Sequence, residues 1–249
     1  MKKTNYRDVS VIDVDERLKI FIACDSSGGI GLKEMDEFKV PPEVTGYHTV
    51  NVITCELEAL GVVPKVIVNN LCAEMKDTGE RVIKGIKKYL SENYENEEIE
   101  ITGSTEENFK TYQTSLGMVA IGYKKDKDFE FFNTKENNSL LVVGKPKVGE
   151  EVLINQEENI NASTIRTLRQ IKGVVDIVPV GSKGIRYEAE NIGKNKALKI
   201  IYNQELKINL EKSAGPSTCC IATVDEDVVN IDDIKEKIGK PVEMIGVFN

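Results

Sequence analysis

Histidine and tryptophan are nearly absent from this sequence of 249 residues, which contains one histidine, His48, and no tryptophan. A single histidine argues against a zinc site built from several imidazole ligands. A Ser-His-Asp site would have to use His48, which lies in a predicted helix, and no G-x-S-x-G segment is present to supply the serine. We therefore expect His48 to be an ordinary residue at a helix surface or at the edge of the core.

Cysteine is present, but not in a pattern of paired thiols. The five cysteines include no C-x-x-C pair, and their odd number is typical of reduced thiols. Cys24, Cys55 and Cys72 stand among apolar residues, so we expect them to fill the core. The first 16 residues contain lysines but no apolar segment of a secretory signal, which leads us to expect a cytoplasmic protein.

The sequence also lacks long apolar runs and an excess of basic residues. No run approaches the roughly 20 apolar residues that cross a bilayer, so we expect no membrane partner. The net charge of −8 argues against a general nucleic-acid binder. It is compatible with ATP as a ligand, because a metal ion can bridge acidic side chains to phosphates.

The familiar nucleotide-binding motifs are missing. Gly144 and Gly149 have the spacing of a P-loop, but Glu150 stands where that motif requires a lysine. The segment "GGIGLKE" lacks the last glycine of the dinucleotide fingerprint, and the protein-kinase H-R-D and D-F-G signatures are absent. A nucleotide site in this chain would have to be of another kind.

Strands and helices are mixed in both halves of the chain. Strands are predicted in residues 9–24 (a pair), 64–72, 114–123, 197–203, 212–224 and 241–249, and strands that run into loops in 97–108, 140–153 and 174–184. Helices are predicted in residues 43–60, 78–94, 161–171, 187–195 and 231–239. Thr78 is expected to cap the second helix, and Asn161 or Ser163 the third. Because strands often follow one another directly, the pattern favours an α+β fold over a doubly wound sheet. The charged, asparagine-rich residues 124–139 suggest a boundary between domains of residues 1–130 and 131–249.

A segment rich in small residues follows an apolar run near the N-terminus. "FIACDSSGGIG" (residues 21–31) reads as a strand that delivers Asp25 to a glycine loop, and several glycines together suggest close approach of the backbone to a ligand. Oxygen ligands at strand ends suit Mg²⁺, and small residues let backbone N–H groups face phosphates. A solvated turn is the competing interpretation. Glu56 lies on the following helix among apolar neighbours, which suggests a buried acid that needs a partner.

Four segments, in this order, resemble one superfamily. "IACDSSGGIG" is similar to its acidic metal loop, "VITCELEALGVVPKVIV" to its acid-bearing helix and following strand, "ITGSTEENF" to its Gly-Gly-acid-Thr loop, and "GPSTCCIATV" to its late glycine loop. This is the AIR synthase-related (PurM-like) superfamily, which includes thiamine-monophosphate kinase, selenophosphate synthetase and a hydrogenase-maturation protein. Within it, "CDSSGGIG", "TGSTEENF", "VPVGSKG" and "SAGPSTC" are most similar to the α-ribazole kinases of Gram-positive bacteria.

The resemblance implies a two-domain α+β fold. An N-terminal α/β domain would bind ATP and Mg²⁺ and dimerise through its sheet, and a C-terminal α/β domain would cover the site. Asp25 and Glu56 would be metal ligands, with Glu56 replacing the more usual aspartate. Ser104 stands where an acid is common, so either Glu106, as the third metal ligand, or Glu107 would supply the missing charge, or the site would bind fewer metal ions.

The resemblance also implies two further sets of site residues. ATP would be bound by Ser26, Ser27, Gly28, Gly29, Gly103, Ser104, Thr105 and Asn108, and the substrate by Lys147, Lys183, Gly215 and Ser217. For Thr105 and Asn108 the competing interpretation is that they satisfy turn backbone. For the two lysines it is that they are plain surface charges.

The activity that the resemblance implies is ATP-dependent phosphorylation of the 5′-hydroxyl of α-ribazole, a precursor of the cobalamin lower ligand, by a cytoplasmic homodimer. Phosphoryl transfer asks mainly for positioning and electrostatics, so the lack of an obvious general base does not exclude a kinase. The alternatives are a thiamine-monophosphate kinase, another ATP-dependent enzyme of the superfamily, and a non-enzymatic ATP-binding dimer. A selenophosphate synthetase would need a reactive cysteine, and Cys24, in an apolar strand, is a poor nucleophile.

Overall fold

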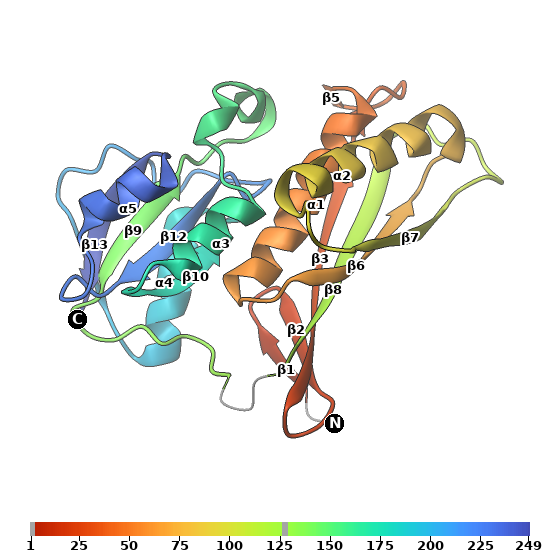
Figure 1. The fold of residues 1–249 in the computed structure, drawn as a ribbon. Helices are drawn as coiled ribbons and strands as arrows, with labels where there is room; N and C mark the ends of the chain where they lie inside the picture. The colour runs from red at the N-terminus through yellow and green to blue at the C-terminus, as the bar shows by residue number, and fades with distance from the viewer. Residues whose placement is uncertain (1–2, 126–128) are drawn as a thin grey trace. The chain divides into compact units, whose positions relative to one another are not determined.

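The structure is a computed structural model that describes residues 3–125 and 129–249 (Figure 1). The chain divides into two compact units, one formed by Met1–Leu57 and Val62–Asp128 and the other by Glu58–Gly61 and Phe129–Asn249. The predicted boundary segment, residues 124–139, contains residues 126–128, which lie outside the described residues. None of the helices in the described part of the chain combines the length and the apolar character needed to span a bilayer.

The first unit is built on a six-stranded sheet with the strand order β1-β2-β3-β8-β6-β7. The strands are β1 (Lys3–Tyr6), β2 (Val9–Asp13), β3 (Leu18–Gly28), β6 (Pro64–Leu71), β7 (Glu100–Thr105) and β8 (Ser115–Lys125). All neighbouring strands are antiparallel except β6 and β7, which are parallel. Two short strands, β4 (Ile30–Gly31) and β5 (Phe38–Lys39), form a separate parallel pair.

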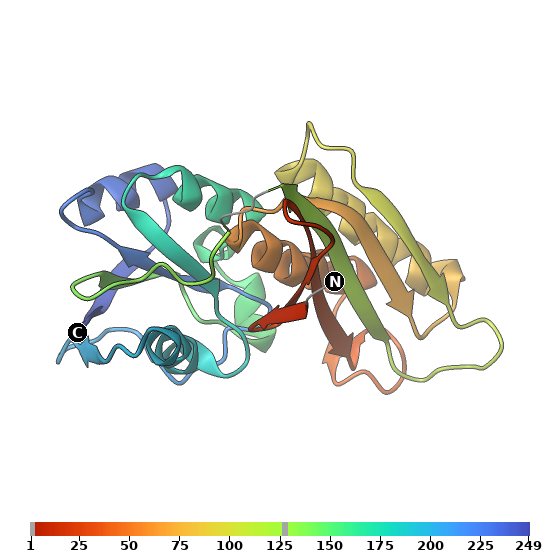
Figure 2. The ribbon, with the colours of Figure 1, turned by 90° about the horizontal axis from the view of Figure 1, so that it is seen from below.

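Two helices, α1 (Pro42–Ala59) and α2 (Glu80–Asn93), lie on one face of this sheet (Figures 1 and 2). Side chains alternate along the strands, so Phe21, Ile67 and Met118 on the covered face are fully buried. A five-residue π-helical turn, η1 (Met75–Gly79), precedes α2. The prediction that Thr78 caps α2 is wrong, because its hydroxyl donates instead to the Glu74 carboxylate.

The glycine loop begins later than the sequence predicts. β3 continues through Asp25, Ser26 and Ser27, and it pairs with β8 as far as Gly28 opposite Ser115. Pairing with a long neighbouring strand therefore overrides the low strand propensity of the serines and the glycine. Asp25 is consequently a residue inside a strand rather than on a loop.

The prediction for the cysteines is correct for one of the three. Cys55 is buried, whereas Cys24 and Cys72 are exposed. Cys24 points to the opposite face of β3 from the buried Ala23, because neighbouring residues of a strand face opposite sides. The run of apolar letters around Cys24 therefore does not place it in the core.

The second unit is built on a five-stranded antiparallel sheet with the order β10-β12-β9-β13-β11. Its elements are β9 (Ser139–Gly144), η2 (Gly149–Leu153), η3 (Gln156–Glu158), α3 (Ala162–Gln170), β10 (Val174–Pro179), α4 (Gly184–Lys196), β11 (Ile200–Tyr202), β12 (Cys219–Val224), α5 (Ile231–Ile238) and β13 (Val242–Phe248). Helices α3 and α5 cover one face and α4 the other (Figure 2). Every residue of β9 and β12 is therefore buried.

Most predicted elements are confirmed in position. α1 and β6 fall within two residues of their predicted bounds, and α4 extends further toward the N-terminus than residues 187–195. Asn161 caps α3, since its side chain accepts a hydrogen bond from the Thr164 backbone N–H at 2.9 Å. The expectation of mixed sheets and helices with adjacent strands holds in both units.

Candidate functional site

Strand register gathers the predicted nucleotide-binding residues of the first unit at one end of its sheet. Strands β3, β6 and β7 run in the same direction, with β8 antiparallel between β3 and β6. One row across the sheet contains Ser26, Gly117, Asn70 and Ser104. Segments almost 80 residues apart in sequence therefore end side by side, which the sequence pattern alone does not show.

Asp25 lies one row back, on the face of the sheet that the helices cover. Burial raises the pKa of its carboxyl group, a hydrogen bond from the Ser26 backbone N–H lowers it, and the neighbouring Asp8 carboxylate raises it. No ion pair to Asp25 is formed by the residues that the structure describes. A half-buried carboxylate beside a second one is a place where a bound cation would relieve electrostatic cost.

Glu56, on α1, is 7% exposed, which confirms the expectation that it is buried and needs a partner. Its carboxylate pairs with Arg7, whose Nη1 atom lies 2.9 Å from Glu56 Oε2. Arg7 and Asp8 form the turn between β1 and β2, and their charged groups lie 3.8 Å apart. Asp25 and Glu56 are thus both neighbours of this dipeptide.

A buried amide in the same cross-strand row as Asp25 was not predicted from the sequence. Asn69 on β6 occupies the same cross-strand row as Asp25, separated from it by Met118 on β8. The Asn69 side chain is 5% exposed, and its Oδ1 atom has no hydrogen-bond partner among the described residues. An unsatisfied buried amide oxygen costs about 1–3 kcal/mol, so it points to a donor or a cation that comes from outside the chain. The polar letters that end the apolar run "PKVIVNNL" are the sequence signal that could have identified it.

The carboxylates of Glu106 and Glu107 accept hydrogen bonds from the protein itself. The Glu106 carboxylate accepts the backbone N–H groups of Asn108 at 2.7 Å and Phe109 at 3.2 Å. Glu107 accepts from the Thr105 hydroxyl at 2.7 Å and from the Met75 backbone N–H at 2.8 Å.

The carboxylates do not assemble into a three-ligand metal cluster. Within residues 3–125 and 129–249, no three His, Cys, Asp or Glu side chains come together to hold a metal ion. Mg²⁺ needs only one or two carboxylates when phosphates and water complete its shell. Asp25 could supply one such carboxylate, and Glu56 could supply a second once its pairing with Arg7 is released.

Two glycines of the predicted nucleotide site have roles in packing and in backbone hydrogen bonding. A Cβ atom at Gly103 would lie 1.8 Å from the Asn69 carbonyl oxygen, so only glycine allows β7 to approach β6 there. The Gly29 N–H donates to the Thr114 carbonyl at 2.8 Å, which engages it inside the protein. Close packing of strands therefore explains part of the glycine content that suggested a ligand.

Loops at one end of the five-stranded sheet carry the predicted substrate-binding residues of the second unit. Thr218 joins two of these loops, because its hydroxyl donates to the Lys145 carbonyl and accepts the Lys147 N–H. Gly215 and Ser217 lie just before it in the same loop, and Ser217 is buried. The Lys183 ammonium donates to the Tyr187 hydroxyl at 3.1 Å and lies over the Tyr187 ring.

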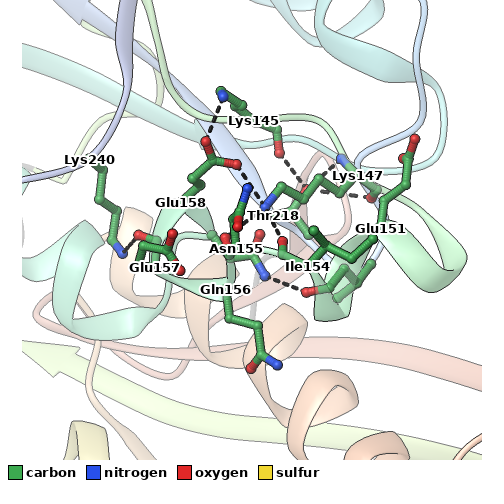
Figure 3. A network of polar contacts seen from close by, with 12 residues as sticks. Lys145, Lys147, Glu151, Ile154, Asn155, Gln156, Glu157, Glu158, Thr218 and Lys240 are labelled. Carbon is green, nitrogen blue, oxygen red and sulfur yellow. Dashed lines mark hydrogen bonds and ion pairs between the residues drawn. The ribbon is translucent and has the colours of Figure 1, made fainter.

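Lys147 is held inside its own loop (Figure 3). Its Nζ atom donates to the carbonyl oxygens of Ile154 at 2.7 Å and Asn155 at 2.8 Å, and it lies 3.0 Å from Glu158 Oε2. An ammonium group has three N–H bonds, and these three acceptors account for all of them. A ligand that contacts this nitrogen would have to replace one of them.

His48 is not part of either cluster. Burial lowers its pKa to about 4, with a further contribution from Lys88, so the imidazole is neutral at pH 7. Its ring packs edge-on against Tyr47 on α1. This is the ordinary half-buried position that the sequence predicts.

Comparison with known proteins identifies the fold. No protein-family model and no curated protein matches the chain. The chain shares its fold with solved structures of two kinds of protein, thiamine-monophosphate kinase and HypE. AaThiL complexed with AMPPCP and TMP matches with a TM-score of 0.67 and 15% identity over 97% of this chain and 84% of that one. Thiamine-monophosphate kinase from Stenotrophomonas maltophilia K279a matches with a TM-score of 0.66 and 13% identity, over 97% and 86%. The hydrogenase maturation protein HypE in complex with ATP matches with a TM-score of 0.62 and 13% identity, over 91% and 76%.

Proposed function

We propose that this chain is an ATP-dependent small-molecule kinase that binds Mg²⁺ through Asp25 and Glu56. The observation that carries the proposal is the Asp25 carboxylate, which is half-buried on the helix-covered face and whose pKa the negative charge of Asp8 helps to raise. The shared fold supports it, since AaThiL is solved with AMPPCP and HypE with ATP. The unsatisfied Asn69 amide oxygen lies in the same cross-strand row, beyond Met118.

The proposed roles of the remaining residues follow from the register. Bound Mg²⁺ would supply charge neutralisation for the ATP phosphates. The residues at and just beyond the ends of β3 and β7 would position the triphosphate, and these are Ser26, Ser27, Gly28, Gly29, Gly103, Ser104, Thr105 and Asn108. In this proposal Glu106 acts through the turn that it stabilises, because its carboxylate holds two backbone N–H groups there. Kinases need chiefly positioning and electrostatic stabilisation, so a hydroxyl acceptor held in line would suffice.

The acceptor that we propose is the 5′-hydroxyl of α-ribazole, on the resemblance of the site segments alone. Lys183, Gly215 and Ser217 would contact it, and Lys147 would hold the neighbouring loop in shape. Thiamine monophosphate is the second candidate, and AaThiL complexed with AMPPCP and TMP favours it. We do not expect nucleic acid or membrane as a partner, and we place the enzyme in the cytoplasm.

The uncovered face of the six-stranded sheet supports a homodimer. Its central residues are apolar and only half-buried, namely Ile20, Ile22, Val66, Val68, Val119 and Ile121. An apolar sheet face without helices needs a cover, and a second copy of the chain would provide one. Light scattering should therefore report twice the chain mass, and Val119→Lys should give the monomer.

The direct test is incubation with Mg²⁺ and ATP together with α-ribazole or, separately, thiamine monophosphate, followed by detection of ADP and the phosphorylated product. Asp25→Asn should abolish turnover in a folded protein. Asp15→Asn is the matched control, because Asp15 is an exposed acid that only stabilises the β2–β3 turn. Turnover of neither acceptor by the wild type would remove both kinase hypotheses.

A further inference from the structure

The ion pair between Arg7 and Glu56 is unusual for this chain. The two side chains are 6% and 9% exposed. Among the ion pairs that the described residues form, this is the one in which both side chains are less than one-tenth exposed. By contrast, the Arg81–Glu43 pair of the same unit is 38% and 27% exposed. Removing one partner of a buried pair leaves the other charge uncompensated, which costs about 3–5 kcal/mol.

This pairing conflicts with direct coordination of a metal by Glu56. The Arg7 guanidinium lies 2.9 Å from Glu56 Oε2, whereas Mg²⁺ requires its oxygen ligands at about 2.1 Å. Two cations on one buried carboxylate repel each other strongly where little water screens them. Coordination of a metal by Glu56 Oε2 therefore requires Arg7 to withdraw.

We infer that Arg7 is a positioning residue that neutralises Glu56 in the metal-free protein and gives up this carboxylate to the divalent cation. The inference rests on the proposed function. An exchange of one cation for another never leaves the buried carboxylate alone, so the site stays folded in both states. Arg7 thereby sets how strongly the site binds metal.

The surroundings of Arg7 allow such an exchange. Arg7 lies in a two-residue turn between Tyr6 and Val9, with a positive φ of 50°, in the hairpin that forms the outer edge of the sheet. Movement of this turn leaves the ladder between β3 and β8 intact. Asp8, whose side chain is 73% exposed and 3.8 Å away, offers the guanidinium a second carboxylate nearer the solvent.

Competition of this kind has a measurable size. If the state in which Arg7 has left Glu56 is populated at about 1–10%, the apparent metal affinity is reduced about 10- to 100-fold. Removing the guanidinium should therefore tighten metal binding by the same factor. A purely structural Arg7 would give the opposite result, because its loss would loosen the site.

The test is calorimetric titration of Mg²⁺, in the presence of AMPPCP, into the wild type, Arg7→Met and the control Arg81→Met. We expect binding that is about 10- to 100-fold tighter in Arg7→Met and unchanged in Arg81→Met. Equal or weaker binding by a folded Arg7→Met would overturn the inference. Asp25→Asn separates the two proposals: if it binds as the wild type does, or if the wild type itself does not bind, the proposed function fails. If Asp25→Asn loses binding while Arg7→Met equals the wild type, only the role of Arg7 fails.

A measurement on the wild type covers the case in which Arg7→Met does not fold. The Nε–H signal of Arg7 in an NMR spectrum can be assigned by its loss in Arg7→Lys. Addition of Mg²⁺ and AMPPCP should shift this signal and speed its exchange with water, because the guanidinium leaves a buried carboxylate. A signal that neither moves nor exchanges faster at saturating Mg²⁺ would contradict the exchange of cations.

Discussion

Replacing Lys147 by methionine distinguishes a lysine that holds a loop from one that contacts a ligand. The methionine side chain fills a similar volume but cannot donate to the carbonyl oxygens of Ile154 and Asn155 or neutralise Glu158. Hydrogen bonds that involve a charged group contribute about 1.5–3 kcal/mol each, and part of this is recovered because Glu158 can turn to solvent. We expect Lys147→Met to lower the free energy of unfolding by about 2–4 kcal/mol.

Lys145→Met is the matched control. The Lys145 ammonium is 53% exposed and pairs with the same carboxylate, Glu158. An exposed pair of this kind contributes about 0–1 kcal/mol. The pKa of Glu158 is lowered by Lys145 and by Lys147, so both variants should raise it toward its usual value.

The assay is urea denaturation combined with native-state hydrogen exchange, because a chain of two units need not unfold in one step. In Lys147→Met the amides of residues 149–158 should lose protection, whereas Lys145→Met should leave them unchanged. The reasoning is refuted if Lys147→Met is as stable as Lys145→Met, keeps the protection of this loop and instead binds the acceptor more weakly.

Three further predictions concern the first unit. The pKa of His48 is about 4 in the folded protein and 6.5 when unperturbed, so between pH 6.5 and pH 4 only the unfolded state takes up the proton. The free energy of unfolding of the wild type should therefore fall by up to about 3 kcal/mol over this range, and denaturation curves of His48→Gln should show a smaller fall. Gly103→Ala should lower the free energy of unfolding by about 2–4 kcal/mol, because the added Cβ would push β7 away from the Asn69 carbonyl oxygen. Gly117→Ala, where the added Cβ meets open space, should change it little in the same measurement. Since burial and Asp8 raise the pKa of Asp25, its carboxylate form is less stable in the folded protein than in water, and Asp25→Asn should raise the free energy of unfolding by about 0.5–2 kcal/mol; a loss of stability would contradict this.

The sequence predicts those elements whose signal is local. The apolar periodicity of residues 43–60 and the buried run of residues 64–72 each fit one kind of element, and both elements form. The end of β3 was placed too early because serine and glycine are poor strand formers. Pairing of Gly28 with Ser115, 87 positions away, extends β3 to Gly28, and no local sequence pattern indicates this pairing.

The site shows the same division between local and distant information. Sequence reasoning could infer that Glu56 is buried and needs a partner, because its neighbours are apolar. It could not identify Arg7 as that partner, since 49 positions separate them and the contact depends on the β1–β2 hairpin. Nor could sequence reasoning show that Lys147 is held within its own loop, because its acceptors there are mostly backbone carbonyls, which are the same in every residue type.

Binding of AMPPCP with and without Mg²⁺, measured by calorimetry for the wild type and Asp25→Asn, tests the central claim most directly. The account predicts saturable binding by the wild type that requires Mg²⁺ and is lost when the Asp25 carboxylate is replaced. Binding that is independent of Mg²⁺, or equally strong in folded Asp25→Asn, would contradict it.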